Sequence, residues 1–252
     1  GQCRLWQYLV TATGVEDARS DSRQNRNQDQ NSEDNATGTD SRGTASEVGE
    51  WGSSMDRLAP NVLRVVVMNV GGFPLDARES KNKAVFNFIK EHKVDVIGFT
   101  ECNVHWKGVP TADRLEERTR GWFEALHMST AYFKNWGEGQ VSPKEQYGGV
   151  SLWSINKAAH RVTSRGEDPL GLGRWTWTRY QGRGVTLRVV AAYRPVLNTS
   201  GVLSVWSQHR ALLLYRGDLR CPRDVFIQDL QVEIQSWIAA GDQIVLGIDA
   251  ND

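Results

Sequence analysis

The sequence has 252 residues, 39% of them hydrophobic, including ten Trp, which suffices for one large domain or for one domain and a tail. Its 30 basic and 30 acidic residues give a formal net charge of zero, so no global basic field points to nucleic acid. The three Cys are widely spaced and odd in number, which argues against a disulfide framework and favours a reducing compartment. No apolar run approaches the roughly 18–20 residues that span a bilayer, and no signal-like segment is present. We therefore expect no membrane association and an intracellular location, nuclear or cytoplasmic.

Residues 1–60 are interpreted as a leader that precedes the folded domain. Between residues 13 and 54, Ser, Asn, Gln, Asp, Gly and Thr dominate, and large apolar side chains are almost absent. Such a segment buries too little surface to offset the entropy lost on ordering, so we expect disorder. The short apolar stretch at 5–10 is interpreted as the remnant of an upstream domain or as a sticky end. Residues 61–252 then form the domain, and they are mildly basic because the leader is acidic.

The domain is expected to alternate between strands and helices. Runs of β-branched residues indicate strands, and apolar residues at the helical period indicate helices. Because helices both precede and follow a block of strands, they must cover the sheets on their outer faces. The expected fold class is α/β (α+β), a two-sheet sandwich flanked by helices. In chain order, the expected elements are a strand at 62–70, a helix at 79–92, a strand at 94–99, a helix at 112–126, strands at 131–136, 149–154, 160–164, 175–180 and 185–193, helices at 202–214 and 225–239, and a strand at 244–248.

Polar residues stand at the carboxyl ends of several expected strands: Asn69, Glu101, Tyr193, Asp249 and Asn251. In open α/β sheets, ligands bind at this edge. A single Glu after a strand is most often a solvated surface residue, and a single Asn is most often a turn residue. The set as a whole, and not any one member, therefore indicates a site.

Five segments follow one another along the chain: VMNVGG at 67–72, DVIGFTE at 95–101, YGGVSL at 147–152, AYRP at 192–195, and a helix at 224–237 before GIDAN at 247–251. In this order they resemble motifs of the endonuclease/exonuclease/phosphatase superfamily, which includes exonuclease III, abasic-site endonucleases, deoxyribonuclease I and the endonuclease domains of non-LTR retrotransposons. The last segment has one residue inserted between the Gly and the Asp of the family's Gly-Asp-x-Asn motif, so the resemblance is carried over to Asp249 and Asn251 and not to Gly247. It runs from residue 63 to residue 251 and implies a four-layer α/β/β/α sandwich of the DNase I type.

The resemblance implies divalent-metal-dependent hydrolysis of phosphodiester bonds, most like the retroelement or abasic-endonuclease branch, with DNA as the substrate. Glu101, with Asn69 beside it, would hold Mg²⁺ or Mn²⁺, which prefer hard oxygen ligands. The metal would neutralise charge that develops on the phosphate. Asp249 and Asn251 would hold and polarise the attacking water. Tyr193 would contact the scissile phosphate, and Asn69 would also orient the catalytic groups.

The family's closing motif, an Asp followed by His after a Ser or Thr, has no counterpart before Asp252. We therefore interpret the chain as an incomplete domain and expect residues 61–252 to nick DNA poorly and to leave a sheet edge uncovered. His160 and His209 lack the flanking pattern and are expected at the surface or on a helix face. Two alternatives remain open: a phosphatase or phospholipase acting on a small phosphoester in the same fold, and a catalytically inactive fragment or binding module.

Other features have simpler interpretations. Trp175 and Trp177 alternate along a strand, which favours sheet packing over a base-stacking platform. The Gly-rich stretch at 171–174 is expected to be a loop, and Cys102 a small core residue. Four arginines of the strand region could face phosphates or solvate a sheet edge: Arg179, Arg183, Arg188 and Arg194.

Overall fold

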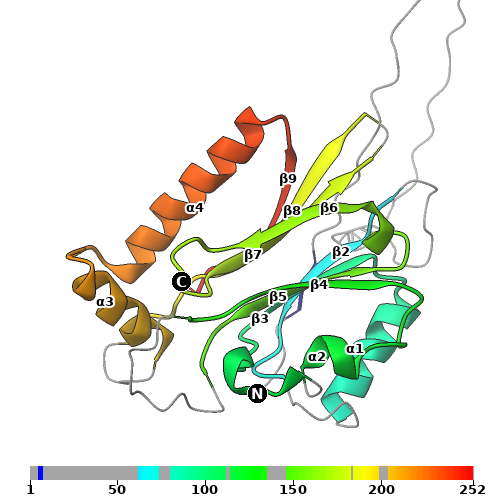
Figure 1. The fold of residues 1–252 in the computed structure, drawn as a ribbon, viewed down its shortest axis with the longest axis horizontal. Coiled ribbons are helices and arrows are strands. Elements are labelled where there is room, and N and C mark those ends of the chain that lie inside the picture. Colours follow the sequence, from blue (N-terminus) through cyan, green and yellow to red (C-terminus); the bar gives the residue numbers. More distant parts are fainter. Residues whose placement is uncertain are drawn as a thin grey trace, which may run out of the picture.

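The computed structural model describes residues 5–7, 62–73, 80–111, 114–134, 146–182, 184–198 and 204–251. The described chain forms two mixed β-sheets that pack face to face, with helices on the outer faces (Figure 1). The two-sheet sandwich expected from the sequence is thereby confirmed. The leader segment at 13–54 lies outside the described residues.

The first sheet has five strands, and one pair of neighbours in it is parallel while the others are antiparallel. β2 and β3 are parallel, whereas β5 is antiparallel to both of its neighbours. β1 pairs with β2 in the antiparallel sense, so residues 5–7 of the apolar stretch at 5–10 extend the first sheet. The strand order is β1 (Leu5–Gln7), β2 (Val65–Asn69), β3 (Val96–Thr100), β5 (Val150–Ile155) and β4 (Leu126–Ala131).

The second sheet has four strands and ends in a parallel pair. β8 and β9 run side by side from Leu187 opposite Gln243 to Tyr193 opposite Asp249. Because the two strands are parallel and in this register, both deliver their last residue to the same edge. The strand order is β6 (Val162–Glu167), β7 (Trp175–Gln181), β8 (Thr186–Tyr193) and β9 (Gln243–Asp249).

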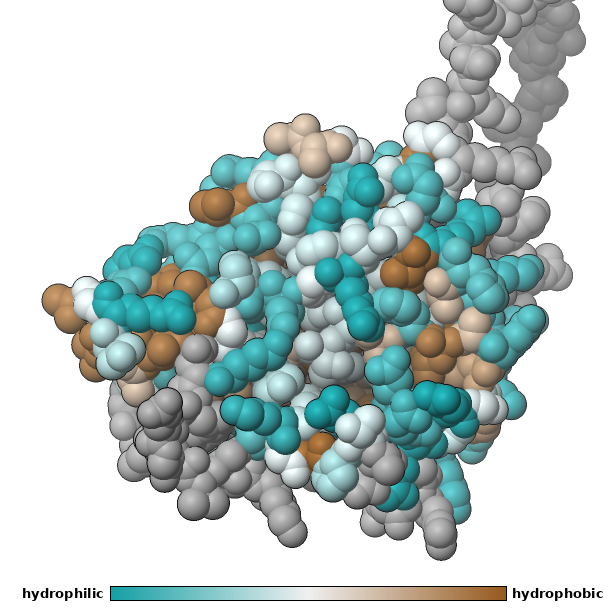
Figure 2. Space-filling model, viewed as in Figure 1, coloured by the Kyte–Doolittle hydropathy of each residue, from teal (hydrophilic) through white to brown (hydrophobic). Residues whose placement is uncertain are grey.

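Each sheet has its own helical layer (Figure 1). Val85 and Ile89 of one helix pack into the apolar layer behind the first sheet, and Phe226 and Leu230 of another pack behind the second. In the described part of the chain, no helix is both long and apolar enough to cross a membrane. Figure 2 shows exposed apolar side chains around the end of α3. The helices are α1 (Ser80–Glu91), α2 (Leu115–Arg118), α3 (Val205–Tyr215) and α4 (Pro222–Ala239), with short 3₁₀ turns η1 (Trp106–Gly108) and η3 (Ala159–Arg161).

Two glycines allow the sheets to approach closely at their centre. A Cβ atom on Gly247 would lie 2.1 Å from Val67 Cγ2, and one on Gly98 would lie 2.8 Å from Ala191 Cβ. Neither separation is possible between real carbon atoms, so a larger residue at either position would force the sheets apart. Gly247, which the family motif did not explain, therefore has a packing role between the sheets.

Two expected elements, the helix at 112–126 and the strand at 131–136, have different bounds in the structure, and a third, the strand at 160–164, starts later than expected. The helix expected at 112–126 is reduced to Leu115–Arg118, because the chain then turns through Gly121, whose φ is +86°. The strand expected at 131–136 lies instead at Leu126–Ala131, where it pairs with β5 along its whole length. Residues 135 and 136 lie outside the described residues. The strand expected at 160–164 begins only at Val162, after η3.

The simpler interpretations of three residues are confirmed. Trp175 is fully buried and contacts Phe226 edge to face, and Trp177 packs against Trp237. Both tryptophans therefore serve sheet packing. Cys102 is fully buried, and burial raises the pKa of its thiol far above the usual range, which suits a core residue and not a nucleophile.

Candidate active site

All five residues singled out from the sequence lie at one edge of the sandwich. Asn69 ends β2 and lies opposite Thr100, so Glu101 follows directly beside it. Tyr193 ends β8 opposite Asp249, the last residue of β9. The side-chain amide of Asn69 donates a hydrogen bond of 2.8 Å to Asp249 Oδ2. This bond joins the end of one sheet to the end of the other.

The carboxylate of Asp249 is held by two donors from the opposite sheet. Besides Asn69, the hydroxyl of Thr100 donates to Asp249 Oδ2 at 3.2 Å. Both bonds fall on the same oxygen, so the carboxylate is oriented with Oδ1 directed elsewhere. Asn69 is itself fixed, because its Oδ1 accepts from the backbone N–H of Gly71 at 2.9 Å. Sequence reasoning missed Thr100, and the only available signal was its place directly before Glu101 on a buried strand.

Tyr193 is a buried phenol surrounded by the other site residues. Burial raises its pKa far above the usual range, and the charge of Glu101, a hydrogen bond to Glu101 and the charge of Asp249 raise it further, while a hydrogen bond from Asn251 opposes them. The hydroxyl therefore stays protonated and acts as a donor. The backbone N–H of Tyr193 donates to the carbonyl of Arg174 at 2.8 Å, which holds the backbone from which the Tyr193 side chain projects.

Glu101 occupies a strained backbone conformation. Its φ is +52°, in the left-handed region that residues other than Gly rarely adopt. Its carbonyl accepts a 2.7 Å hydrogen bond from the N–H of Gly72, which ties the ends of β2 and β3 together. Such strain persists only where surrounding contacts enforce it, and it concentrates at functional sites.

Asn251 belongs to the loop after β9 and stabilises the two strand ends beside it. Its φ is +48°, and its side-chain amide donates to the carbonyl of Arg194 at 2.7 Å. Arg223, near the start of α4, donates to the carbonyls of Pro195 at 3.1 Å and Asn251 at 2.5 Å. Sequence reasoning missed Arg223 because it acts on backbone carbonyls, for which the sequence has no signature.

The glycine pair of the YGGVSL segment supports the loop after Glu101. Gly148 and Gly149 have φ values of +84° and +82°. Asn103 accepts a 2.7 Å hydrogen bond from the N–H of Gly148 through its Oδ1, and the N–H of Cys102 donates to the carbonyl of Gly149 at 3.1 Å. The turn that carries Glu101 is thereby fixed to the start of β5.

A buried ionic cluster lies behind Tyr193. Asp168 and Arg174 have fully buried side chains and form a bidentate pair, with hydrogen bonds of 2.7 and 2.8 Å. Arg174 also contacts Asp229 of α4 at 2.8 Å.

His209 lies on a face of α3, but that face is buried. Its ring is 1% exposed, and Nε2 donates to the carbonyl of Leu172 at 2.9 Å. The expectation of a helix-face position is right for His209, and His160 is exposed as expected.

Two of the four arginines left open by the sequence serve the fold. Arg179 and Arg188 both pair with the buried carboxylate of Asp242, and Arg188 also lies over the rings of Trp177 and Trp237. They therefore hold the second sheet to its helix and do not face a substrate. Arg183 is outside the described residues, and Arg194 is half-buried next to Tyr193.

The donor set suits a hard divalent cation. The carboxylates of Glu101 and Asp249 both act on the Tyr193 hydroxyl, so they offer oxygen ligands at one place, while Asn69 directs its amide nitrogen to Asp249. Mg²⁺ typically binds through one or two carboxylates, completing its shell with waters and substrate phosphate. Within the described residues, no cluster of three or more His, Cys, Asp or Glu side chains could hold an ion by itself. The residues present thus fit a cation that shares its ligands with substrate.

Residues 66–252 match the model of the Endonuclease/Exonuclease/phosphatase family. No curated protein matches the sequence. Similar solved structures include an AP endonuclease from Archaeoglobus fulgidus (16% identity, TM-score 0.44, covering 75% of this chain and 57% of that one).

Two further structures have comparable similarity. One is a 3'-5' exonuclease from Neisseria meningitidis, with 15% identity and a TM-score of 0.44, covering 73% of this chain and 56% of that one. The other is the catalytic domain of human Nocturnin, with 13% identity and a TM-score of 0.43, covering 75% of this chain and 64% of that one. The chain therefore spans less than two thirds of the length of each of these structures. Since the family model covers most of the chain, the protein belongs to the endonuclease/exonuclease/phosphatase family of phosphodiesterases, nucleases and phosphatases.

Proposed function

We propose that this chain hydrolyses phosphodiester bonds in DNA, as an endonuclease of the retroelement or abasic-site type. The observation that supports the proposal is the convergence of Glu101, Tyr193 and Asp249 at one edge, with Asn69 bonded to Asp249 across the sheets. Hydrolysis of a phosphodiester requires an oriented water, a donor to the phosphate and a means of offsetting negative charge. This edge offers a residue for each requirement.

Each side chain has a role that follows from its contacts. Asp249 accepts the proton of the attacking water, with its carboxylate oriented by the bonds from Asn69 and Thr100 to Oδ2. Tyr193, kept protonated by its raised pKa, donates to a non-bridging oxygen of the phosphate. Asn251 secures the strand end from which Tyr193 projects. Glu101 and Asn69 would hold Mg²⁺ or Mn²⁺, which when bound would offset charge on the phosphate.

The test is a nicking assay on supercoiled plasmid with enzyme in excess, so that slow single turnovers are visible. We expect cleavage in Mg²⁺ that EDTA abolishes. Asp249→Asn and Glu101→Gln should each reduce the rate by about 10²–10⁴-fold, the usual contribution of a general base or an equivalent charged group. Asp218→Asn is the matched control, because Asp218 pairs with Arg220 on the turn between α3 and α4.

Two results would contradict the proposal. Nicking that survives Asp249→Asn at the wild-type rate would remove the role of this carboxylate. Faster hydrolysis of a small phosphomonoester than of DNA, with the same dependence on Asp249, would assign the site to phosphatase chemistry instead. Circular dichroism of each variant shows whether a lost rate reflects lost folding.

A further inference from the structure

Lys81, the second residue of α1, reaches back to the loop that follows β2. Its ammonium group donates to the carbonyl oxygens of Val70 at 2.7 Å, Gly72 at 2.9 Å and Gly71 at 3.5 Å. A lysine ammonium has three N–H donors, so three consecutive carbonyls account for all of them. This loop directly follows Asn69, the last residue of β2.

Two of these carbonyls belong to peptide groups whose N–H groups hold active-site residues. The carbonyl of Val70 shares its peptide group with the N–H of Gly71, which donates to Asn69 Oδ1 at 2.9 Å. The carbonyl of Gly71 shares its peptide group with the N–H of Gly72, which donates to the carbonyl of Glu101 at 2.7 Å. A trans peptide group is planar, and its C=O and N–H point in opposite directions. A cation that fixes the carbonyls therefore also fixes the direction of the N–H groups.

Packing contributes little to the middle of this loop. At its far end, Phe73 is buried and contacts the ring of Phe99 edge to face at 4.8 Å. Gly71 and Gly72 carry no side chains, and both have positive φ values, +54° and +97°. A Cβ atom on Gly71 would meet no described atom within 4 Å. The two glycines therefore lie in open space, and hydrogen bonds, including those of Lys81, hold them in place.

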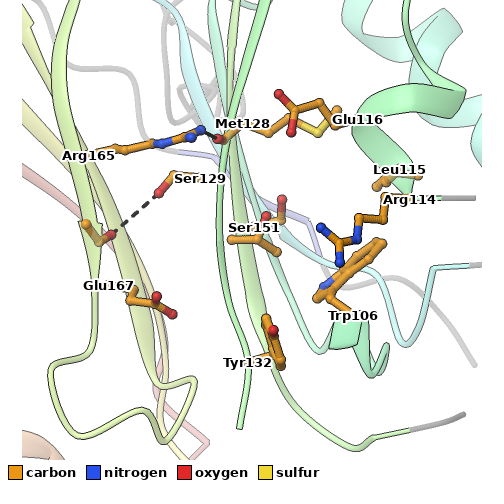
Figure 3. Close-up of a pocket in the computed structure, with 12 residues that line it drawn as sticks. Trp106, Arg114, Leu115, Glu116, Met128, Ser129, Tyr132, Ser151, Arg165 and Glu167 are labelled. Atoms are coloured by element: carbon orange, nitrogen blue, oxygen red, sulfur yellow. Dashed lines mark hydrogen bonds between the residues drawn. The ribbon is translucent and has the colours of Figure 1, made fainter. Parts of the chain in front are cut away.

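Packing is also incomplete along the chain after Glu101. The chain continues to η1, where Trp106 lines a cavity of about 390 Å³ together with Tyr132 and Ser151 (Figure 3). A cavity supplies none of the contacts that hold a tightly packed segment. The strained backbone of Glu101 therefore depends all the more on its hydrogen-bonded neighbours, which are the glycine pair before β5 and the N–H of Gly72.

The position of Lys81 in its helix is electrostatically unfavourable. The first turn of α1 contains no acidic residue, and the N-terminus of a helix carries a partial positive charge that disfavours a cation. The contacts with three carbonyls offset this cost. The second sheet repeats the arrangement, because Arg223 is also the second residue of its helix and donates to the carbonyls of Pro195 and Asn251. A helix of each outer layer thus sends a cation from its first turn to a loop at the active site.

We propose that Lys81 is a positioning residue of the active site. Its ammonium group orients the peptide groups after β2, and these groups hold Asn69 and Glu101 in place. Lys81 acts through these two residues and does not touch the phosphate. The inference rests on the proposed function, since it assigns Lys81 to the cleavage of phosphodiester bonds. The orientation of Asn69, however, is measurable without catalysis.

The first experiment measures the loop without catalysis. In ¹H–¹⁵N spectra of the full chain, the side-chain amide of Asn69 is the signal absent from Asn69→Ala, and it reports the bond to Asp249. Lys81→Met removes the charge at nearly the same side-chain length. We expect this change to shift the Asn69 signal. It should also speed hydrogen exchange at the amide of Gly72 at least about tenfold, which is the usual contribution of a hydrogen bond to a charged group.

The control variants separate this effect from loss of charge and from loss of folding. Lys83→Met removes the same charge from an exposed position of α1 and should leave both signals unchanged. Lys81→Arg keeps a cation and should restore the Asn69 signal and most of the exchange protection of Gly72. If circular dichroism shows that Lys81→Met does not fold, Lys81→Gln takes its place, because it also removes the charge.

The second experiment measures single-turnover nicking of plasmid at saturating enzyme. We expect Lys81→Met to lower this rate about 10- to 100-fold, as is typical when the support of a catalytic group is lost. The affinity for DNA should not change when Lys81→Met is added to Asp249→Asn and binding is measured in EDTA. In an Asn69→Ala background, Lys81→Met should have a much smaller effect on the rate, because one of the two residues through which Lys81 acts is gone.

Several results would overturn the proposal. One is an unchanged Asn69 signal and unchanged exchange at Gly72 in Lys81→Met. Another is an equal loss of rate in the wild-type and Asn69→Ala backgrounds. Weaker DNA binding at an unchanged rate would assign Lys81 to substrate binding instead. A shifted Asn69 signal in a chain that does not nick DNA would remove the proposed function and leave Lys81 as the residue that orients Asn69. Nicking that depends on Asp249 but not on Lys81 would do the reverse.

Discussion

The side chain of Asn69 reaches across the interface of the two sheets and donates to Asp249, a residue 180 positions later in the chain, at 2.8 Å. If the role of Asn69 is to orient this carboxylate, Asn69→Ala should lower the nicking rate about 10- to 100-fold, as is typical for a partner that orients a catalytic group. The same change in an Asp249→Ala background should then have almost no effect, because the group that it orients is gone.

A double-mutant cycle on single-turnover rates measures this coupling. Asn87→Ala, on the exposed side of α1, is the control and should act equally in both backgrounds. Equal losses from Asn69→Ala in the two backgrounds would show that Asn69 acts on something other than Asp249.

The buried pair of Asp168 and Arg174 should be a strong determinant of stability. Both side chains are fully buried, so Asp168→Ala leaves a guanidinium without its bidentate partner and should cost about 3 kcal/mol of unfolding free energy. Urea unfolding measures the loss. The exposed pair of Arg120 and Glu117 is the comparison, and Glu117→Gln should change stability by less than about 1 kcal/mol. Similar effects at both sites would mean that Asp229 alone satisfies Arg174.

Contact between the sheets at Gly247 predicts a specific suppressor. Gly247→Ala places a methyl group where Val67 Cγ2 now lies 2.1 Å away, so it should destabilise the fold by about 1–3 kcal/mol through overpacking. Val67→Ala removes the obstructing methyl groups. The double variant should therefore be more stable than the sum of the two single changes predicts. Strict additivity in thermal or urea unfolding would show that the clash relaxes elsewhere.

His209 should make stability depend on pH in a defined window. Burial, followed by the charge of Arg174, lowers its pKa from 6.5 to about 4. Between those two values the unfolded chain binds a proton that the folded chain does not, so stability falls as the pH is lowered from 6.5 to 4. The contribution of this residue is on the order of 3 kcal/mol, since each unit corresponds to about 1.4 kcal/mol.

The measurement for His209 is urea unfolding at several pH values between 4 and 7. His209→Gln keeps a donor for the Leu172 carbonyl but cannot titrate, so its stability should vary less over this range than that of the wild type. His160→Gln, at an exposed position, should retain the wild-type slope. A wild-type slope in His209→Gln would assign the pH dependence to other groups.

Sequence reasoning located most strands because their signal is local. The apolar runs that became β2 and β3 are buried almost throughout, and their hydrophobicity shows it directly. β4 was misplaced because its sequence, LHMSTA, has little strand character. It forms a strand because it pairs with β5, and β5 lies too far along the chain for the residues around β4 to indicate this pairing. The stretch at 112–126 was expected to form one helix, but the chain turns at Gly121 within it.

The site was partly predictable for a related reason. Parallel strands present their carboxyl ends at one edge, so placing Asn69 beside Glu101 and Tyr193 beside Asp249 required only the expected strands. The contact between these two pairs depends on how the sheets stack, and no spacing in the sequence encodes it. Thr100 and Arg223 were missed because a hydroxyl on a buried strand and a bond to backbone carbonyls look like ordinary structural features.

Because Asn69 and Glu101 belong to one sheet and Tyr193 and Asp249 to the other, neither half of the sandwich contains a complete set of site residues. The site therefore reports on the closure of the sandwich. If the sheets slide or separate while each keeps its own hydrogen-bonded strands, the site residues lose their contacts with one another before either sheet loses its strands. Loss of the site would then be an early indicator of opening, ahead of the loss of secondary structure.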